Sequence, residues 1–190
     1  MGWFQQKRAV ILVILAVGGL AFVRSLFDLK VGDHVEDFSL FTTDGKSMTL
    51  ASLTQNQDLF LYFVKPDCPF NAEALPYLSS IYRAYGDKSN MLGVFTGDIG
   101  IYRVWQPKEN CPVPMALDPF LEITRKLQAS YSPWIIQIDR SGTVKHVWKG
   151  YSTGALEEIN AAVARAAGLP KAKISMLGAP EGLTHGCPFR

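Results

Sequence analysis

Three cysteines, Cys68, Cys111 and Cys187, are the residues best suited to chemistry in this sequence of 190 residues. Their odd number allows one intramolecular disulfide at most and leaves a spare thiol. No pair of them has the spacing of zinc ligands, and the histidines His34, His146 and His185 stand far apart in the sequence. The sequence therefore predicts no metal site and no cofactor, so that any cysteine chemistry here would be redox chemistry.

Cys68 stands where a buried strand gives way to a helix. Residues 59–64 (Leu-Phe-Leu-Tyr-Phe-Val) form a continuous apolar and aromatic run, which is typical of a strand buried on both faces. Pro69 then opens a helix that should end near residues 85–87. A cysteine at a helix N-terminus faces free backbone N–H groups and the positive end of the helix dipole, which favour a thiolate. We therefore take Cys68 as the candidate nucleophile, with Lys65 as a possible contributor; an inert half-buried cysteine is the alternative.

The segment around Cys68 resembles the active-site turn of the thioredoxin superfamily. Residues 64–71 (Val-Lys-Pro-Asp-Cys-Pro-Phe-Asn) are most similar to the redoxin branch, which is related to AhpC/TSA peroxiredoxins and to membrane-tethered thiol-disulfide proteins. Residues 112–119 (Pro-Val-Pro-Met-Ala-Leu-Asp-Pro) and 132–142 (Ser-Pro-Trp-Ile-Ile-Gln-Ile-Asp-Arg-Ser-Gly) extend the resemblance, which covers roughly residues 32–168. It implies a thioredoxin-like mixed sheet flanked by helices.

The sequence departs from this family at the positions that complete its usual chemistry. Asn71 stands where thioredoxins and their tethered relatives carry a second cysteine, so a mixed disulfide on Cys68 could not be resolved locally. Lys65 replaces the threonine of peroxiredoxins, and Ser132-Pro133 occupies the region of their arginine, so peroxidase chemistry is disfavoured. Ala72 replaces the second cysteine of related copper chaperones, which argues against a copper site.

The resemblance also suggests a second thiol and a partner-binding loop. In related folds the segment after Cys111 ends near the active-site turn, so Cys111 is a candidate resolving thiol; an unpaired loop cysteine is the alternative. Ser132-Pro133 resembles the cis-proline loop of thioredoxin-like proteins, which offers its backbone to an extended partner chain. Ser132, Pro133 and Trp134 are therefore candidate partner-binding residues.

The remaining pattern predicts an α/β domain. Short apolar runs on either side of Asp44-Gly45, and again on either side of residues 139–142, indicate two hairpins. Residues 91–95 and 115–117 read as strands, and helices are expected at about 101–105, from 118 to about 129, and from Ser152 or Thr153 to about 167. This order gives a mixed sheet covered on both faces.

The N-terminus predicts a membrane anchor. Lys7 and Arg8 precede an apolar stretch that continues to residue 27 if Arg24 reaches the interface, which is long enough for one helix. The positive-inside rule then places the N-terminus in the cytoplasm and the domain in the periplasm or otherwise outside the membrane. A cleaved signal peptide is the alternative, favoured by the short run and by Gly19-Leu20-Ala21.

The predicted organisation is thus a cytoplasmic N-terminus (1–8), a transmembrane anchor (9–27), a thioredoxin-like redoxin domain (28–168) and a C-terminal tail (169–190). The formal net charge of +2, without a basic run, argues against nucleic-acid binding. The tail is rich in Gly and Pro, a composition that predicts disorder unless something holds it; we expect a partner protein in a membrane complex to do so.

Two functions remain open on the sequence. The first is a non-catalytic accessory or docking subunit of a larger membrane complex, which the missing cysteine at Asn71 favours. The second is an extracytoplasmic thiol-disulfide oxidoreductase with Cys68 as nucleophile and either Cys111 or a partner's cysteine as resolving thiol. We favour the first, because the loss of local resolution removes the usual catalytic cycle.

Overall fold

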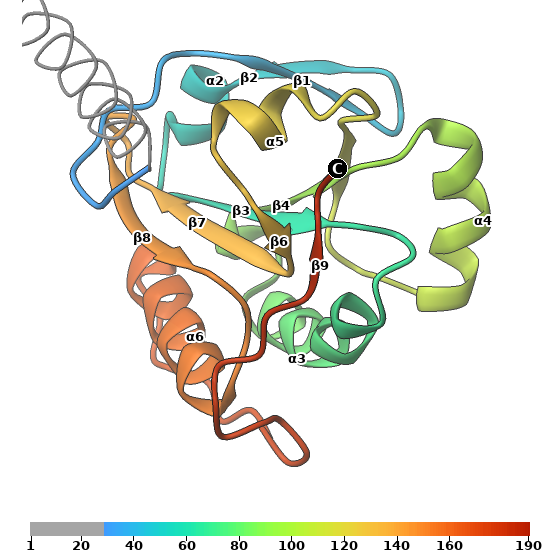
Figure 1. Ribbon diagram of the computed structural model, residues 1–190. Helices are drawn as coiled ribbons and strands as arrows, with labels where there is room; N and C mark the ends of the chain where they lie inside the picture. Colours follow the sequence, from blue (N-terminus) through green and yellow to red (C-terminus); the bar gives the residue numbers. More distant parts are fainter. Residues whose placement is uncertain (1–28) are drawn as a thin grey trace, which may run out of the picture.

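A seven-stranded mixed sheet forms the centre of the computed structural model, which describes residues 29–190 (Figure 1). The strand order is β2-β1-β5-β4-β3-β7-β8. The strands are β1 (Ser39–Thr42), β2 (Ser47–Thr49), β3 (Leu59–Val64), β4 (Met91–Phe95), β5 (Met115–Leu117), β7 (Trp134–Ile138) and β8 (Val144–Trp148). Strands β3, β4 and β5 are parallel, whereas β1, β2, β7 and β8 join the sheet through antiparallel pairs.

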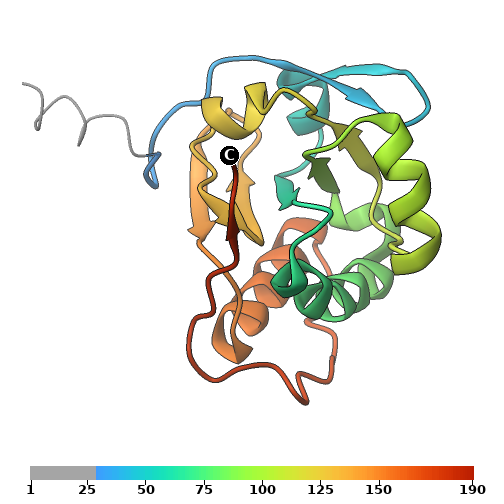
Figure 2. The same ribbon diagram turned by 45° about the vertical axis from the view of Figure 1, so that its right-hand side comes forward.

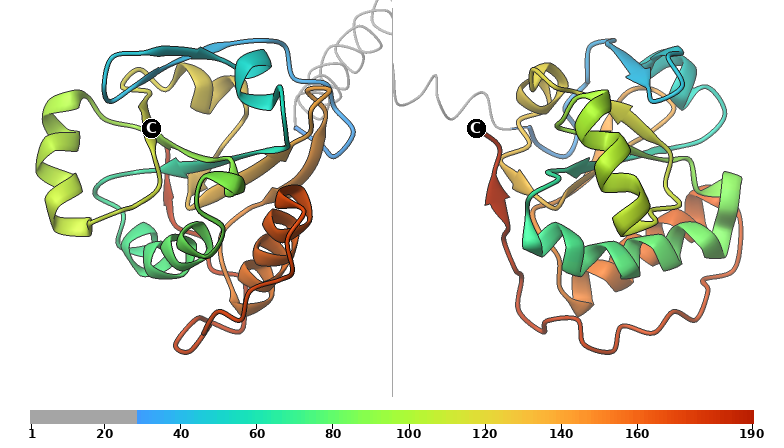
Figure 3. Two further views of the ribbon diagram at one scale, coloured as in Figure 1. Left: turned by 180° about the vertical axis from the view of Figure 1, so that it is seen from behind. Right: turned by 90° about the vertical axis from the view of Figure 1, so that its right-hand side faces the viewer.

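Helices cover both faces of this sheet (Figure 1). The two long helices α3 (Pro69–Tyr85) and α6 (Thr153–Ala167) pack side by side on one face, and the short helices α2 (Leu50–Thr54) and α5 (Glu122–Lys126) lie on the other (Figures 1 and 3). A 3-10 turn, η1 (Gly86–Ser89), follows α3, and α4 (Ile99–Glu109) lies at one side of the sheet. This is the mixed α/β arrangement that the sequence predicts.

Strand β3 shows why both faces need a cover. Its six side chains are all buried and alternate between two apolar clusters, because successive side chains of a strand point to opposite faces. Phe60 and Tyr62 lie in the cluster with α3 and α6, where Leu78 and Ile159 are fully buried. Leu61 and Phe63 lie in the cluster with α2 and α5. The two cores together fix the end of β3, and hence the start of α3.

Most predicted elements are confirmed, and two helices differ. The strands, both hairpins, helix α3 and the Ser152 cap of α6 lie where the sequence places them. Helix α4 is longer than predicted, because it continues through Pro107 to Glu109. Helix α5 is shorter, since Leu121 adopts a left-handed conformation (φ 59°) and the Asp118 carboxylate accepts the N–H groups of residues 122–124. The acidic side chain therefore caps a helix that starts later than expected.

The predicted anchor, residues 9–27, lies outside the described residues. Within residues 29–190 no helix combines the length and the apolar character that crossing a bilayer requires.

Candidate functional site

Cys68 caps the N-terminus of α3 at the carboxyl end of the central strand β3. Its backbone carbonyl accepts the N–H groups of Asn71 and Ala72, the first bonds of the helix. Pro69 at the first helical position supplies no N–H and fixes a helical φ, which favours a helix start here. The side chain exposes only 2% of its surface, so the sulfur faces protein atoms on nearly every side.

Two backbone groups contact the Cys68 sulfur. The thiol donates to the Ser132 carbonyl oxygen at 3.5 Å. The backbone N–H of Cys187 donates to the sulfur at 3.2 Å. These groups belong to segments that are 64 residues and 119 residues away along the chain, so only the folded domain brings them together. Cys68 therefore lies where three distant segments of the chain meet.

The loop at Ser132-Pro133 forms the second wall of this site, and its peptide bond is cis, as the resemblance implies. The buried Ser132 hydroxyl accepts the Lys65 N–H at 3.1 Å, and it lies 3.3 Å from both the Phe63 carbonyl oxygen and Asn71 Oδ1. Pro133 and Trp134 are buried behind it, and the Lys149 amine lies 5.3 Å from the centre of the Trp134 ring. The loop consequently presents its backbone, and not these side chains, to the Cys68 side.

Asn71, where relatives carry a second cysteine, is buried and hydrogen-bonded. Its Oδ1 accepts from the Tyr62 hydroxyl and lies within reach of the Ser132 hydroxyl. Burial raises the pKa of Tyr62 well above its ordinary value, so this phenol stays a protonated donor. Asn71 thus ties α3, β3 and the cis-proline loop to one another, a structural task that its side chain performs in place of redox chemistry.

Cys111 lies in the core cluster beside α3 and α6. It is 4% exposed, and its thiol donates to the Val113 carbonyl oxygen at 3.9 Å. Burial raises the pKa of Cys111 to about 11. No described contact joins the Cys68 and Cys111 thiols, and all three cysteines are free. The role of Cys111 as resolving thiol stays a prediction.

The C-terminal tail is ordered against its own domain, contrary to the disorder that its composition predicts. It runs beneath α3 and α6 and then rises to pair with β6 (Figures 2 and 3). Ala172 donates its N–H to the Tyr85 hydroxyl at 2.8 Å, and the Leu177 carbonyl accepts the Tyr77 hydroxyl at 3.0 Å. The hydroxyls of α3 therefore hold the first half of the tail against the domain.

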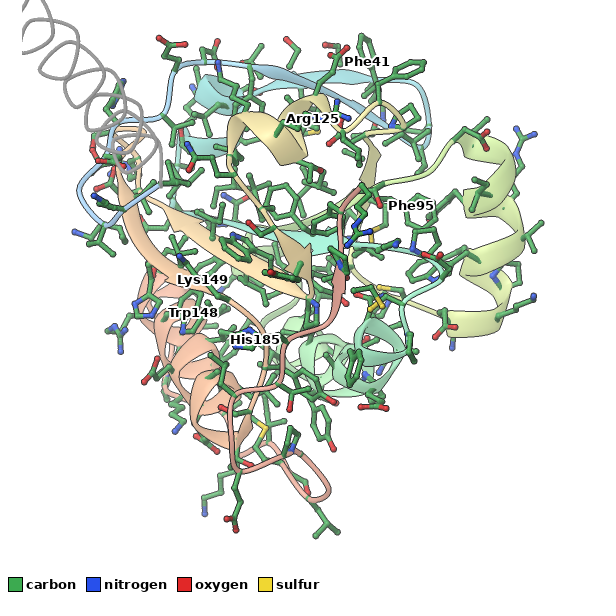
Figure 4. All side chains as sticks on the ribbon, viewed as in Figure 1. Phe41, Phe95, Arg125, Trp148, Lys149 and His185 are labelled. Atoms are coloured by element: carbon green, nitrogen blue, oxygen red, sulfur yellow. The ribbon has the colours of Figure 1, made fainter. Side chains whose placement is uncertain are left out.

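The second half of the tail is held by the segment between β8 and α6. The backbones of Tyr151 and Thr184 exchange two hydrogen bonds, at 3.1 Å and 2.8 Å. Gly150 permits this approach, because a Cβ there would lie 2.3 Å from the Thr184 carbonyl oxygen. His185 follows, with its ring 6.2 Å from that of Tyr131 (Figure 4). This bridge directs the last six residues toward Cys68.

The last residues of the tail form a strand across the site. Strand β9 (Cys187–Pro188) pairs antiparallel with β6 (Tyr131–Ser132), with Ser132 opposite Cys187. Gly186 lies so close to the cis-proline loop that a Cβ would fall 1.4 Å from the Ser132 carbonyl oxygen. Beyond β9, the Phe189 ring meets Phe63 edge-on at 6.4 Å, and its N–H donates to Ser130. The tail thus covers Cys68 by main-chain pairing.

Lys65 is directed at this tail. Its ammonium group donates to the Pro188 carbonyl oxygen at 3.3 Å and lies 3.9 Å from the Asp67 carboxylate. The same charge lowers the pKa of Cys187, but a hydrogen bond with the Cys68 sulfur outweighs it, and the Cys187 pKa is raised overall. Lys65 therefore acts on the site through the tail, by its hydrogen bond to Pro188 and its charge near Cys187. No role for Cys187 was predicted from the sequence.

Sequence reasoning missed Cys187 although one signal was present. The tripeptide Cys-Pro-Phe occurs twice, at residues 68–70 and at residues 187–189, and the odd cysteine count already pointed to a thiol without an assigned role. Beside the site, a groove of about 930 Å³ opens between α4 and the end of the tail. The half-exposed Ile101 and the exposed Val104 form part of its wall, so an apolar surface borders the covered thiol.

Comparison with solved structures shows which fold this is. A putative thiol:disulfide interchange protein DsbE from Chlorobium tepidum is 21% identical, with a TM-score of 0.64 over 73% of this chain and 99% of that one. A secreted Mycobacterium tuberculosis disulfide oxidoreductase homologous to E. coli DsbE is 24% identical (TM-score 0.55, 67% and 95%). The peroxidoxin BcpB of M. tuberculosis is 14% identical (TM-score 0.57, 73% and 96%). At these identities the likeness shows the fold, which is thioredoxin-like.

Sequence comparison places the chain in a family. A search of curated proteins found no match. The Redoxin family profile matches residues 30–164, which include Cys68, the cis-proline loop and every strand of the central sheet. The likeness to DsbE-related proteins and to a peroxidoxin agrees with this match. The chain belongs to the Redoxin family.

Proposed function

We propose that this protein is a thiol-disulfide oxidoreductase that acts on extended polypeptide segments, with Cys68 as its nucleophile. The observation that carries the proposal is the strand β9, which lies across Cys68 with its backbone N–H 3.2 Å from the sulfur. An extended segment bearing a cysteine is therefore accommodated at this edge. Main-chain pairing with β6 would hold any such segment in the same way, since strand addition depends little on side chains.

The surroundings of Cys68 support exchange chemistry. The residue begins a helix of 17 residues, so the positive end of the helix dipole lies on its side. Cys111 begins no helix and lies in an apolar core cluster, where burial raises its pKa to about 11. The DsbE-related structures share this fold and are compatible with this function.

The test is exchange with a disulfide-containing unstructured peptide, using the full chain in detergent. Cys68→Ser should lower the rate of peptide reduction at least about 100-fold, because the nucleophile in thiol-disulfide exchange is the thiolate itself. Cys111→Ala is the matched variant, and it should reduce the peptide at the rate of the unmodified chain. Unchanged exchange in Cys68→Ser would refute the proposal.

An accessory subunit is the second candidate function, and Asn71 is the residue that favours it. A position that relatives use for redox chemistry is here committed to a buried hydrogen-bond network. Gentle extraction from native membranes separates the two functions. A stable, monodisperse monomer without co-purifying proteins counts against the accessory role, and a defined stoichiometric complex supports it.

We also propose that residues 9–27 anchor the domain on the periplasmic or extracytoplasmic side of a membrane. The basic residues before this apolar stretch support the orientation. Cys187 is half-buried and offers a label on the domain itself. A membrane-impermeant maleimide should modify it in intact cells after mild reduction. Modification only after lysis would contradict the orientation.

A further inference from the structure

We propose that Cys187 is the resolving cysteine of this exchange and that the C-terminal tail delivers it to Cys68 as a built-in strand. The inference rests on the proposed function, since a resolving thiol matters only if Cys68 forms mixed disulfides. It replaces the usual local arrangement, in which the second cysteine lies one helical turn after the first. Here that position is Asn71, and the second thiol comes from residue 187, at the other end of the domain.

The contacts bring the two cysteines together without intervening atoms. The Cys187 backbone N–H reaches the Cys68 sulfur at 3.2 Å, and interaction with the Cys68 side chain raises the pKa of the Cys187 thiol. Gly186 is the enabling residue, since even its own hypothetical Cβ would lie 3.2 Å from the Cys68 sulfur. The Cys111 thiol, by contrast, hydrogen-bonds to the Val113 carbonyl oxygen and lies in the core cluster beside α3 and α6. The geometry therefore favours Cys187 over Cys111 as the second thiol.

The tail is held in a way that suits delivery and release. The bridge between Tyr151 and Thr184 fixes the tail six residues before its end, and the contacts before it keep the earlier part of the tail on α3 and α6. The last segment is held by a two-residue strand pair, by Lys65 on Pro188 and by Phe189. A short tether with few contacts gives a high local concentration of the Cys187 thiol and still allows the segment to lift from β6.

The proposed reaction balances as a two-electron exchange. The Cys68 thiolate attacks one sulfur of a substrate disulfide, so that a mixed disulfide forms and the first substrate thiolate leaves. The Cys187 thiolate then attacks the Cys68 sulfur, which forms the Cys68–Cys187 disulfide and releases the second substrate thiolate. The substrate disulfide is reduced to two thiols, which take up two protons, while the protein dithiol is oxidised and has given up two. A protein dithiol from outside is the reductant that restores the two cysteines.

This assignment also predicts competition at one edge. Strand β9 occupies the backbone of β6 at Ser132, the position that an extended substrate would use. The substrate and the tail must therefore alternate there: the tail lifts, the substrate pairs and forms the mixed disulfide, and the tail returns to displace it. Lys65 donates to the carbonyl of Pro188, the residue after Cys187. It therefore loses this hydrogen bond when the tail lifts and regains it when the tail returns.

The experiment traps the mixed disulfide on the full chain in detergent. The reduced protein is mixed with oxidised glutathione, and the reaction is stopped with acid, alkylated and mapped by mass spectrometry at successive times. The unmodified chain should show a Cys68–Cys187 disulfide and little glutathione adduct. In Cys187→Ser the adduct on Cys68 should persist roughly 100-fold longer, since a tethered thiol acts at about millimolar concentration and the free thiol is kept at about 10 µM.

Each of the other outcomes shows whether the role of Cys187 or the proposed function is wrong. An adduct on Cys68 with the same lifetime in Cys187→Ser as in the unmodified chain overturns the role of Cys187 and leaves the oxidoreductase intact. A mapped Cys68–Cys111 disulfide overturns it in favour of Cys111. If Cys68 forms no adduct even in Cys187→Ser, where the sulfur has no competing thiol beside it, the proposed function itself is wrong.

Discussion

Gly186 offers the sharpest test of the covered site, through the substitution Gly186→Ala. The new Cβ would lie 1.4 Å from the Ser132 carbonyl oxygen and 2.6 Å from its carbon. Both are backbone atoms of the cis-proline loop, so no side chain can turn away to make room. The last residues of the tail must therefore leave β6. Gly182→Ala is the matched control, because a Cβ at that glycine of the same tail meets nothing within 4 Å.

The magnitude follows from the contacts that would be lost. Besides the main-chain pairing of β9 with β6, three hydrogen bonds hold the end of the tail, namely Cys187 N–H to the Cys68 sulfur, Lys65 to Pro188, and Phe189 N–H to Ser130. A hydrogen bond contributes a net 0.5–1.5 kcal/mol, so their loss removes about 3 kcal/mol. Because about 1.4 kcal/mol corresponds to a factor of ten in an equilibrium, the open state should gain roughly 100-fold in population.

The assay is the alkylation rate of Cys68 in the reduced full chain, followed by mass spectrometry of its peptide. Cys68 is 2% exposed, so reagent reaches it only when the tail is open, and the rate should rise roughly 100-fold in Gly186→Ala. The buried Cys111 serves as an internal reference, because its rate rises only if the whole domain loosens. Equal Cys68 rates in the Gly186→Ala and Gly182→Ala variants would refute the claim that the tail covers the thiol.

Three further outcomes test the packing and electrostatics of the domain. Burial raises the Cys111 pKa from 9.0 to about 11. The unfolded chain alone therefore loses this proton between these values, which should lower the free energy of unfolding by about 2–3 kcal/mol from pH 9 to pH 11 in urea titrations, and the fall in Cys111→Ala should be smaller by that amount. Asn71→Ala leaves the buried Tyr62 hydroxyl without its acceptor, which should cost about 1–3 kcal/mol, and adding Tyr62→Phe should restore part of it. Leu78→Ala should cost about 2–5 kcal/mol in the same titration, whereas Leu177→Ala, at a position 90% exposed, should stay within about 0.5 kcal/mol; equal losses would contradict the assigned core.

Local patterns predicted the central part of the fold. Six consecutive apolar residues predict strand β3, and Pro69 with the apolar spacing after it predicts α3. Both patterns depend only on residues that are neighbours in the sequence. Helix α5 could not be read this way. The Asp118 carboxylate moves its start to Glu122, and this capping depends on a turn that places a left-handed residue at position 121.

The tail and Cys187 escaped prediction for a different reason. The groups that hold the tail lie far away along the chain: Tyr77 is 100 residues from Leu177, and Tyr85 is 87 residues from Ala172. Composition reports only what a segment can do alone, and a stretch rich in Gly and Pro buries little by itself. The approach of Cys187 to Cys68 likewise depends on the absence of a side chain at Gly186. This requirement becomes visible only in the folded domain, which places Gly186 against the Ser132 backbone.

The position of the covering strand, 119 residues after Cys68, has a consequence for biosynthesis. Because 119 residues separate Cys68 from Cys187, a ribosome adding 5–20 residues per second needs roughly 6–24 s between the two. During that interval the growing chain carries Cys68 without the strand that shields it. A chain that lacks residues 186–189 keeps the Cys68 thiol uncovered. The cover over Cys68 therefore forms only after these residues have been added.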